Sequence, residues 1–230
     1  MATIRLFVSN SMRGVMDTLV PEFRRASGHD VSISYDPVKL MMERIRKGES
    51  ADLAILGGSA IEDLEKAGKI AASSRRAVSS CGVGVAVAAG ARKPDIGTVE
   101  SFKRALLAAK SIAYTEQGAS GIYFSKLIVD LGIEAPVKAK AVRRPGGLVG
   151  EVVAAGEAEL AVQQIPELMA VPGIQLVGPF PTEVQMITQS SAGIFTDARE
   201  PAAARAFLDF LLTPASARVI KAKGHEPAKG

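Results

Sequence analysis

The chain has 230 residues and a formal net charge of +4, with 28 Lys and Arg against 24 Asp and Glu. Hydrophobic residues make up 47% and charged residues 23%, a balance that excludes disordered, coiled-coil and collagen-like chains and fits one large domain or two lobes. Aromatic residues are only 5% and the basic residues are scattered, so we expect no nucleic-acid partner and favour a small anionic ligand.

The first third of the chain predicts alternating strands and helices. The expected strands are residues 3–8, 31–35 and 51–56. A helix with apolar residues on one face follows the first strand and ends at Gly28, and we expect Pro21 to kink or divide it. Further helices are expected at residues 40–47 and in a segment that ends near Gly68. This alternation is typical of a parallel sheet covered by helices.

The same alternation restarts near residue 83. The expected elements are a connecting strand at 82–89, strands at 112–114, 137–142 and 159–162, and helices at 101–109, 122–131 and up to 155. A return strand is expected at 184–195 and two helices at 201–212 and 214–223, which pack back on the first set. We therefore predict an α/β protein with one lobe formed by residues 1–82 and 181–230 and a second formed by 83–180.

Small polar or glycine-rich turns lie where predicted strands lead into helices. They are residues 9–11, 57–59, 118–121 and 146–147. Ligands of open α/β sheets bind beyond the carboxyl ends of the strands, where helix N-termini present N–H groups to anions. One serine in such a turn, taken singly, is better explained as an ordinary N-cap. Four such turns in two lobes indicate an anion cleft between the lobes.

Charged and amide side chains near these turns extend the set. The candidate ligand-binding residues are Asn10, Ser11, Lys39, Gly58, Ser59, Ser120, Gly121, Tyr123, Arg143, Arg144, Gln163 and Gln164. The three cations are either solvated or reach a ligand carboxylate, and we expect one arginine of the pair to do so through its planar guanidinium. The two glutamines either lie on a loop surface or donate amide N–H groups. The tyrosine either packs in the core or places its hydroxyl at the site.

Motifs of enzymes and metal sites are missing from the sequence. There is no G-x-S-x-G, Walker, H-E-x-x-H or dinucleotide-binding motif. Cys81 is the one cysteine, and His29 and His225 are far apart, so neither an internal disulfide nor a metal site of known spacing is supported. We expect no metal and no cofactor. No apolar run approaches the roughly 18 residues that span a bilayer, so no membrane insertion is expected.

Several motifs follow one another along nearly the whole chain. They are the run at 4–8 with Ser9-Asn10-Ser11, Gly48 with Ala51-Asp52-Leu53, Ser120-Gly121-Ile122-Tyr123, and the segment 156–160. This succession resembles the molybdate-binding-protein-like group of solute-binding proteins. The resemblance implies a type II periplasmic-binding-protein fold, in which two lobes, each a mixed and mostly parallel sheet flanked by helices, hold an anion in the cleft between them. It also implies a monomer that serves an ABC transporter permease.

The sequence departs from this group at two positions. Members of the group hold the oxyanion with hydroxyls in the first and second turns, backbone N–H groups in later turns and a late tyrosine. Ser11 and Ser120 match, but the second turn, residues 36–39, has no hydroxyl and Gln163 replaces the tyrosine. A di- or tricarboxylate is therefore favoured over molybdate. The segment 163–168 resembles a branch of the group that includes aconitate isomerase.

Several functions stay open at this point. The favoured one is capture of a small organic anion for ABC-type uptake. The alternatives are an isomerase that shifts an allylic proton in a tricarboxylate, with Lys39 as the catalytic residue, a binder of molybdate or another oxyanion, and a domain that senses a metabolite. No export signal is recognisable, so the protein is expected to be periplasmic if a signal was removed and cytoplasmic if the sequence is complete.

Overall fold

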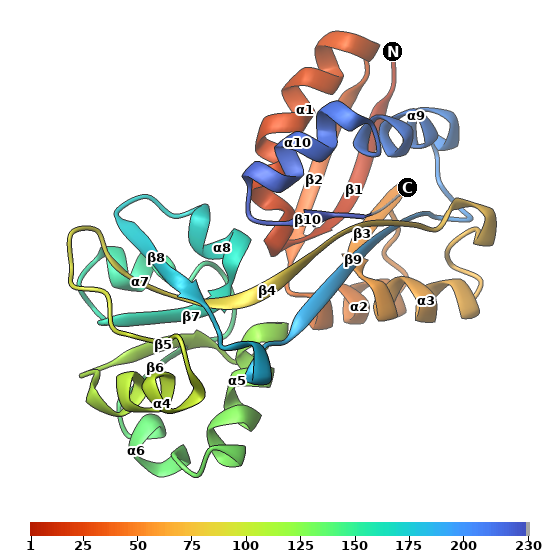
Figure 1. Ribbon diagram of the computed structural model, residues 1–230. Coiled ribbons are helices and arrows are strands. Elements are labelled where there is room, and N and C mark those ends of the chain that lie inside the picture. Colours follow the sequence, from red (N-terminus) through yellow and green to blue (C-terminus); the bar gives the residue numbers. More distant parts are fainter. Residues whose placement is uncertain (229–230) are drawn as a thin grey trace. The chain divides into compact units, whose positions relative to one another are not determined.

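The protein, seen here as a computed structural model that describes residues 1–228, divides into two compact units (Figure 1). Unit 1 comprises Met1–Cys81 and the chain from Thr188 onward, and unit 2 comprises Gly82–Ile187. The sequence places the changes of lobe after residues 82 and 180, so the second differs by seven residues from the change observed after Ile187. Residues 229 and 230 of the predicted first lobe lie outside the described residues.

Hydrogen bonds explain why the segment 181–187 stays with unit 2. The side-chain amide of Gln185 donates to the carbonyl of Val83 at 3.0 Å and accepts from the Val83 N–H at 2.8 Å. The Tyr123 hydroxyl donates to the carbonyl of Val184 at 2.9 Å. These bonds attach the segment to unit 2 before the chain returns to unit 1.

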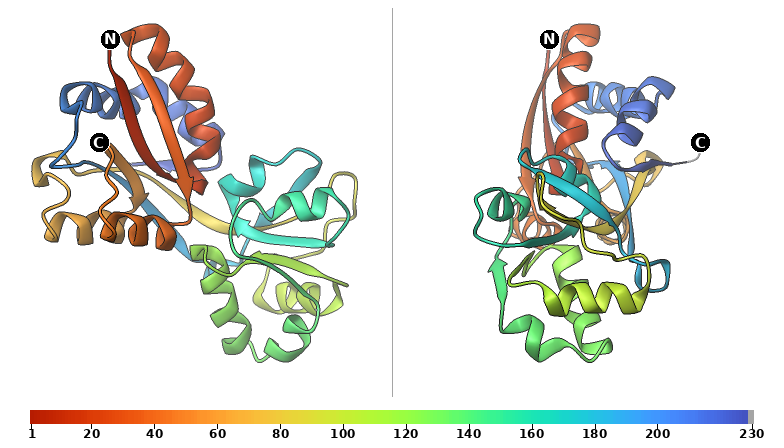
Figure 2. Two further views of the ribbon diagram at one scale, coloured as in Figure 1. Left: turned by 180° about the vertical axis from the view of Figure 1, so that it is seen from behind. Right: turned by 60° about the vertical axis from the view of Figure 1, so that its left-hand side comes forward.

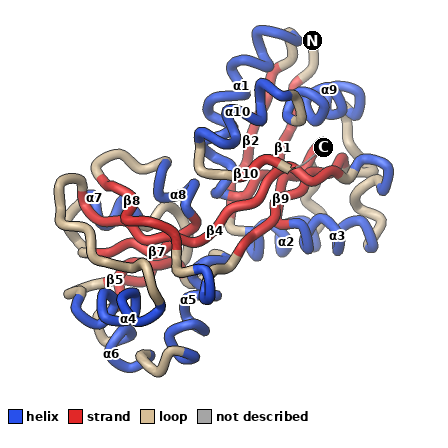
Figure 3. The backbone as a smooth tube through the Cα atoms, viewed as in Figure 1, coloured by secondary structure: helices blue, strands red, loops and turns tan. Residues whose placement is uncertain are grey.

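Unit 1 is built on a mixed sheet with the strand order β2-β1-β3-β9-β4, drawn in red in Figure 3. Its strands are β1 (Thr3–Ser9), β2 (Asp30–Asp36), β3 (Leu53–Gly57), β4 (Arg76–Ala88), β9 (Ile187–Ile194) and β10 (Glu226–Pro227). Strand β1 pairs in parallel with β2 and β3, whereas β9 is antiparallel to β3 and β10 is antiparallel to β4. Strand β4 continues into unit 2.

Helices cover both faces of the unit 1 sheet. They are α1 (Arg13–Ser27), α2 (Val38–Arg46), α3 (Gly58–Lys66), α9 (Pro201–Leu211) and α10 (Pro214–Ala222), with short 3-10 turns at η1 (Asn10–Met12) and η2 (Ala72–Ser74). Figures 1 and 2 show α1, α9 and α10 on one face and α2 and α3 on the other. The alternation of β1 matches this arrangement, because Leu6 joins the first core cluster and Phe7 the second.

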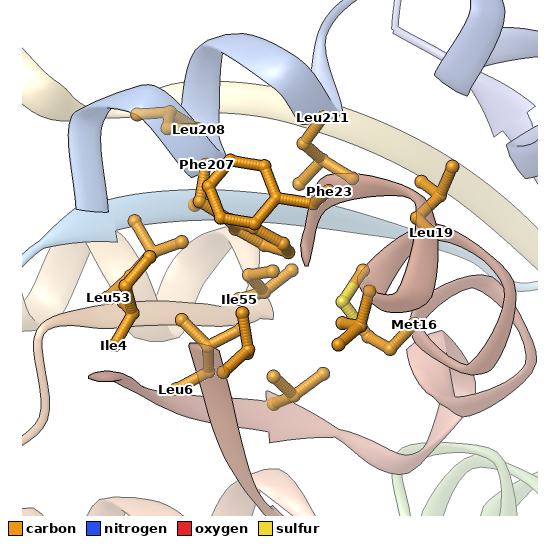
Figure 4. Close-up of a cluster of buried hydrophobic side chains, with 14 of the residues drawn as sticks. Ile4, Leu6, Met16, Leu19, Phe23, Leu53, Ile55, Phe207, Leu208 and Leu211 are labelled. Atoms are coloured by element: carbon orange, nitrogen blue, oxygen red, sulfur yellow. The ribbon is translucent and has the colours of Figure 1, made fainter. Parts of the chain in front are cut away.

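The larger core cluster of unit 1 lies between the sheet and the pair α1 and α9 (Figure 4). Phe23 of α1 meets Phe207 of α9 edge to face, with ring centroids 4.9 Å apart. Leu6 and Ile55 reach the same cluster from the sheet. The predicted packing of the C-terminal helices against the first strands is therefore found within unit 1.

Helix α1 runs without interruption from Arg13 to Ser27, so the expected division at Pro21 is wrong. Pro21 cannot donate a hydrogen bond, but it is exposed, and water can satisfy the carbonyl that loses its partner. The helix ends where predicted, at Gly28, which adopts a φ of 71° and donates its N–H to the carbonyl of Arg24 at 3.0 Å.

Unit 2 is built on a second mixed sheet with the strand order β4-β7-β5-β6. Its further elements are β5 (Ile112–Thr115), β6 (Ala141–Arg144), β7 (Leu160–Gln164), β8 (Ile174–Pro179), α4 (Val99–Ala108), α5 (Ala119–Asp130), α6 (Glu134–Lys138), α7 (Gly150–Ala154), α8 (Ile165–Met169) and η3 (Thr182–Val184). Strand β5 pairs in parallel with β6 and β7, and β4 pairs antiparallel with β7 and β8. Two α/β units with mixed sheets flanked by helices confirm the predicted fold class.

Three expectations for the strands need correction. The strand expected at 137–142 starts at Ala141, because α6 begins just before Pro136 and buries Val137 in the core from a helix. The return strand expected at 184–195 starts at Ile187, after a 3-10 turn. Strand β8 was not predicted. None of the helices in residues 1–228 combines the length and the apolar character that crossing a membrane requires.

Neighbouring leucines at the end of α9 test the core. Leu211 is fully buried and Leu212 is 39% exposed. We expect Leu211→Ala to lower the free energy of unfolding by about 2–5 kcal/mol because a buried cavity is left behind. Leu212→Ala is the matched control and should cost under about 1 kcal/mol. Urea unfolding followed by circular dichroism measures both, and equal losses would contradict the placement of α9.

Candidate functional site

The carboxyl ends of β1, β2 and β3 lie at one edge of the unit 1 sheet. Parallel pairing places Ser9 opposite Asp36 and Val8 opposite Ile55, so the turns that follow the strands are neighbours. We call residues 9–11, 36–39 and 57–59 the unit 1 edge. All five unit 1 candidates predicted from the sequence lie in these turns.

The helices that start at the unit 1 edge lack side-chain caps. The N-cap residues of α1, α2 and α3 are Met12, Pro37 and Gly57, and none makes a side-chain hydrogen bond to the first turn. By contrast, Thr98 caps α4 and Thr213 caps α10 through their hydroxyls. Uncapped helix starts keep N–H groups free and carry a partial positive charge, so this edge suits an anion.

Ser11 is the best-placed hydroxyl of the unit 1 edge. It is 5% exposed and its Oγ lies 3.2 Å from the Oγ of Ser9. Two hydroxyls carry two hydrogens, and their mutual bond uses one, so the other can serve a ligand. Asn10 is partly buried beside them.

Lys39 stands exposed in the first turn of α2. Among the described side chains it has no ion-pair partner, because the nearby Asp36 pairs with Arg44 instead. Arg44 also bonds Glu49 at 2.7 Å and Ser34 at 2.8 Å. Lys39 is thus a free cation, whereas Asp36 is engaged by Arg44.

The start of α3 meets the start of β9, which sequence analysis did not connect. A Cβ atom at Gly58 would lie 3.5 Å from the Oγ of Ser191, and Gly57 pairs with Ser190. Both serines are buried, while Ser59 is exposed. The sequence shows these two hydroxyls in the polar segment before the C-terminal helices. Their position at this edge depends on the antiparallel pairing of β9 with β3.

Unit 2 gathers its candidate residues at the carboxyl ends of β5, β6 and β7. Strand β5 pairs in parallel with both neighbours, and Thr115 lies opposite Arg144. We call residues 115–121, 143–147 and 163–164 the unit 2 edge. Helix α5 starts here after Gly118, again without a side-chain cap.

The turn between β5 and α5 is tight and contains unsatisfied polar atoms. A Cβ atom at Gly121 would lie 1.6 Å from the carbonyl oxygen of Thr115, so only glycine fits there. Ser120 beside it is 2% exposed. Thr115 Oγ1 and Gln117 Oε1 are buried without a hydrogen-bond partner. Such atoms are rare in native proteins, and a ligand or a bound water would satisfy them. Sequence analysis missed both residues.

Gln163 is 1% exposed and braces a loop of unit 2. Its Oε1 accepts from the N–H of Val149 at 2.9 Å, and its Nε2 donates to the carbonyl of Gly147 at 2.8 Å. These bonds hold the glycine-rich turn that follows β6. Gln164, the last residue of β7, is 6% exposed.

Arg143 and Arg144 are the last residues of β6 and not part of the turn after it. Arg143 pairs with Glu116 at 3.2 Å and Arg144 with Glu157 at 3.0 Å, and all four side chains are about half exposed. Exposed pairs of this kind contribute little to stability. The structure gives both arginines carboxylate partners, so it does not single out one of them for a ligand.

Tyr123 lies on α5 and is partly buried against the unit 2 core. Its hydroxyl donates to the carbonyl of Val184. Burial, followed by the charge of Asp130, raises the pKa of this hydroxyl. The side chain therefore has a structural role within unit 2, as in the core-packing interpretation.

Glu167 is a buried carboxyl that sequence analysis did not select. It lies on α8 directly after Gln163 and Gln164, and it is 8% exposed. Burial raises its pKa to about 8, and a hydrogen bond from the backbone of Gln164 partly opposes this shift. A glutamate that reaches back to the start of its own helix forms half of a capping box. Because burial raises its pKa to about 8, the Glu167 carboxyl is mostly protonated at pH 7.

Across residues 1–228 no group of three His, Cys, Asp or Glu side chains is placed to hold a metal ion.

Residues 4–226 match the family described as bacterial extracellular solute-binding protein. The chain belongs to this family. The predicted resemblance to solute-binding proteins is therefore confirmed.

This solute-binding protein has similar relatives of known sequence or structure. An aconitate isomerase from a Pseudomonas species is 34% identical over 98% of this chain and 88% of its own. The periplasmic molybdate-binding protein of Azotobacter vinelandii has a TM-score of 0.82 at 19% identity, covering 98% of this chain and 100% of its own. The sulfate-binding protein SubI of Mycobacterium tuberculosis has a TM-score of 0.78 at 18% identity, covering 100% of this chain and 88% of its own. The two structures confirm the fold.

The stability of this solute-binding protein should respond to pH through Glu167. The folded chain keeps the carboxyl protonated up to about pH 8, whereas the unfolded chain ionises it near its ordinary 4.5. Between these values the unfolded state loses the proton first, so stability falls as pH rises, by at most about 1.4 kcal/mol per pH unit. Glu167→Gln cannot ionise and keeps an acceptor for Gln164. Its stability relative to the wild type should therefore grow from pH 5 to pH 8.

Urea unfolding at four pH values in this window measures the difference. The exposed Glu151 of α7 provides the control, because Glu151→Gln makes the same substitution at a surface position of unit 2. A Glu167→Gln profile parallel to that of the wild type would show that this carboxyl is ionised in the folded protein.

Proposed function

We propose that this chain is a solute-binding protein that captures a small organic anion, with a di- or tricarboxylate preferred over molybdate. The observation that carries the proposal is the set of uncapped helix starts, α1 to α3 at the unit 1 edge and α5 at the unit 2 edge. They offer backbone N–H groups beside the buried hydroxyls of Ser11 and Ser120. Anions bind readily to such helix starts.

The preference for an organic acid rests on three side chains. Lys39 supplies a free cation where the second turn has no hydroxyl, and a carboxylate of an extended ligand can pair with it. Thr115 and Gln117 present buried oxygens without partners. An oxyanion such as molybdate offers only acceptors, whereas a hydroxyl or a protonated acid group of an organic ligand can donate to Gln117.

Transport is the proposed role of this binding. The family is described as extracellular, which supports export of the protein and delivery of its ligand to an ABC-type permease. We propose that the protein acts as a monomer. Of the residues predicted from the sequence, Asn10, Ser11, Lys39, Gly58 and Ser120 are proposed to contact the ligand.

Isomerisation is the second candidate function. It is favoured by the relative named aconitate isomerase, which is 34% identical over nearly the whole of this chain. In this reaction a base removes a proton from the carbon beside one carboxylate, the double bond moves by one position, and a proton returns to the far carbon of the allylic unit. Lys39 is the proposed base and would act with its amine deprotonated; no ion pair among the described side chains holds this amine in its charged form.

A ligand panel tests the first proposal. We expect citrate, cis-aconitate, trans-aconitate or a related acid to raise the melting temperature of the protein, with a larger shift than molybdate or sulfate produces, because ligands that bind only the folded state stabilise it. Thermal-shift screening followed by titration calorimetry makes the measurement. A shift with molybdate alone would refute the carboxylate preference.

The same preparation decides between binding and catalysis. Interconversion of cis- and trans-aconitate is followed by absorbance with and without the protein. A rate above the uncatalysed background that is lost in Lys39→Ala supports the isomerase. Binding of the acid without such a rate supports the transport role alone.

Lys39 is the residue whose removal should change affinity most simply. Lys39→Ala should weaken binding of the acid by ten- to a hundredfold, about 1.4–3 kcal/mol, because a charge-assisted hydrogen bond is lost. Lys47 lies at the other end of the same helix, so Lys47→Ala is the matched control and should change affinity by less than about twofold. Equal affinities for Lys39→Ala and the wild type would show that Lys39 is only a solvated side chain.

A further inference from the structure

A buried histidine lies directly behind the first turn of the unit 1 edge. His225 follows α10 and precedes β10, and it is 1% exposed. Its ring nitrogen Nε2 is 2.9 Å from the carbonyl oxygen of Ser11, a residue 214 positions away in the sequence. The residue contacts the turn that carries Ser11, although it belongs to the end of the chain.

The hydrogen bonds of the ring define its tautomer. A carbonyl oxygen only accepts, so Nε2 must carry the hydrogen that bonds Ser11. The other nitrogen, Nδ1, lies 3.2 Å from the Oγ of Ser79 on β4 and accepts the hydroxyl hydrogen. Burial lowers the pKa of the ring, more than the bond to Ser11 raises it, so the neutral form is the relevant one.

The backbone around His225 is fixed on both sides. Its N–H donates to the carbonyl of Ile220 at 3.2 Å, and beyond it Glu226 and Pro227 pair with Ser80 and Ser79. The ring therefore cannot follow a movement of the Ser11 turn. It holds that turn against a rigid part of unit 1.

The geometry of a peptide bond connects this contact to the helix start. In a trans peptide the C=O and the N–H point in opposite directions. The carbonyl of Ser11 points at His225, so the N–H of Met12 points away from it, into the 3-10 turn η1, where the Arg13 N–H also donates to the carbonyl of Asn10. Fixing this peptide plane thus fixes the Cα that carries the Ser11 hydroxyl.

We propose that His225 is a positioning residue of the anion site, which orients the Ser11–Met12 peptide so that the Ser11 hydroxyl is ready to bind the ligand. This inference rests on the proposed function. The role is carried by Nε2 and its bond to Ser11. The bond from Nδ1 to Ser79 anchors the ring and serves stability. Preorganisation of this kind raises affinity because the ordering cost is met on folding and not on binding.

A matched pair of variants separates the two ring nitrogens. The amide nitrogen of Gln reaches the position of Nε2, so His225→Gln can still donate to Ser11. The shorter Asn reaches only the position of Nδ1, so His225→Asn keeps a partner for Ser79 and loses the bond to Ser11. We expect His225→Gln to bind citrate, or cis-aconitate if the panel favours it, within about threefold of the wild type, and His225→Asn to bind about tenfold more weakly.

Ser79→Ala supplies the control for stability. It removes the partner of Nδ1 and leaves the bond to Ser11, so its melting temperature should fall while its affinity stays within about threefold of the wild type. Calorimetric titration and thermal unfolding of the full chain give both quantities for each variant. The proposal predicts that affinity follows the bond to Ser11, whatever the order of the melting temperatures.

Two results would overturn the proposal, and they differ in meaning. If the wild type binds an acid and His225→Gln and His225→Asn bind it equally well, the positioning role is wrong and the proposed function stands. If the wild type binds none of the acids and no oxyanion, the proposed function fails, and the positioning role fails with it.

Discussion

The parallel pairing of β1 with β2 and β3 is the constraint on which the site depends. It brings three strand ends to one edge of unit 1, and each end leads into a helix. The residues at these helix starts are Met12, Pro37 and Gly57, which have no side-chain oxygen to act as a cap. Backbone N–H groups therefore remain free at the starts of α2 and α3, and an anion is the natural partner for them.

Asp52 shows the opposite arrangement at the start of α9. This fully buried carboxylate accepts hydrogen bonds from the backbone of Arg5 at 2.7 Å, Arg199 at 2.7 Å and Glu200 at 3.0 Å. It joins β1 to the segment before α9 and satisfies the free donors there. The same unit thus closes one helix start with its own carboxylate and leaves others without a side-chain cap, and these are the ones proposed to serve a ligand.

Much of the fold was predictable because it depends on near neighbours in the sequence. The spacing of apolar residues predicted α1, and Gly28 predicted where it ends. The predicted division at Pro21 was wrong because the effect of a proline on a helix depends on its exposure. On the solvent side of the helix, water replaces the missing hydrogen bond. The strand expected at 137–142 failed for a related reason, since Val137 is apolar in either conformation and the packing of α6 decided between them.

The sequence by itself determined the order of strands and helices apart from α6 and β8, most of the turns at their ends, and Ser11, Lys39 and Ser120 as candidates. Only the tertiary structure decided which side chains are already engaged, as Gln163 is with the loop at Gly147. The contact between His225 and Ser11 was likewise decided only by the tertiary structure. Local patterns depend on residues within a few positions, whereas a hydrogen bond between distant residues exists only after the core has packed.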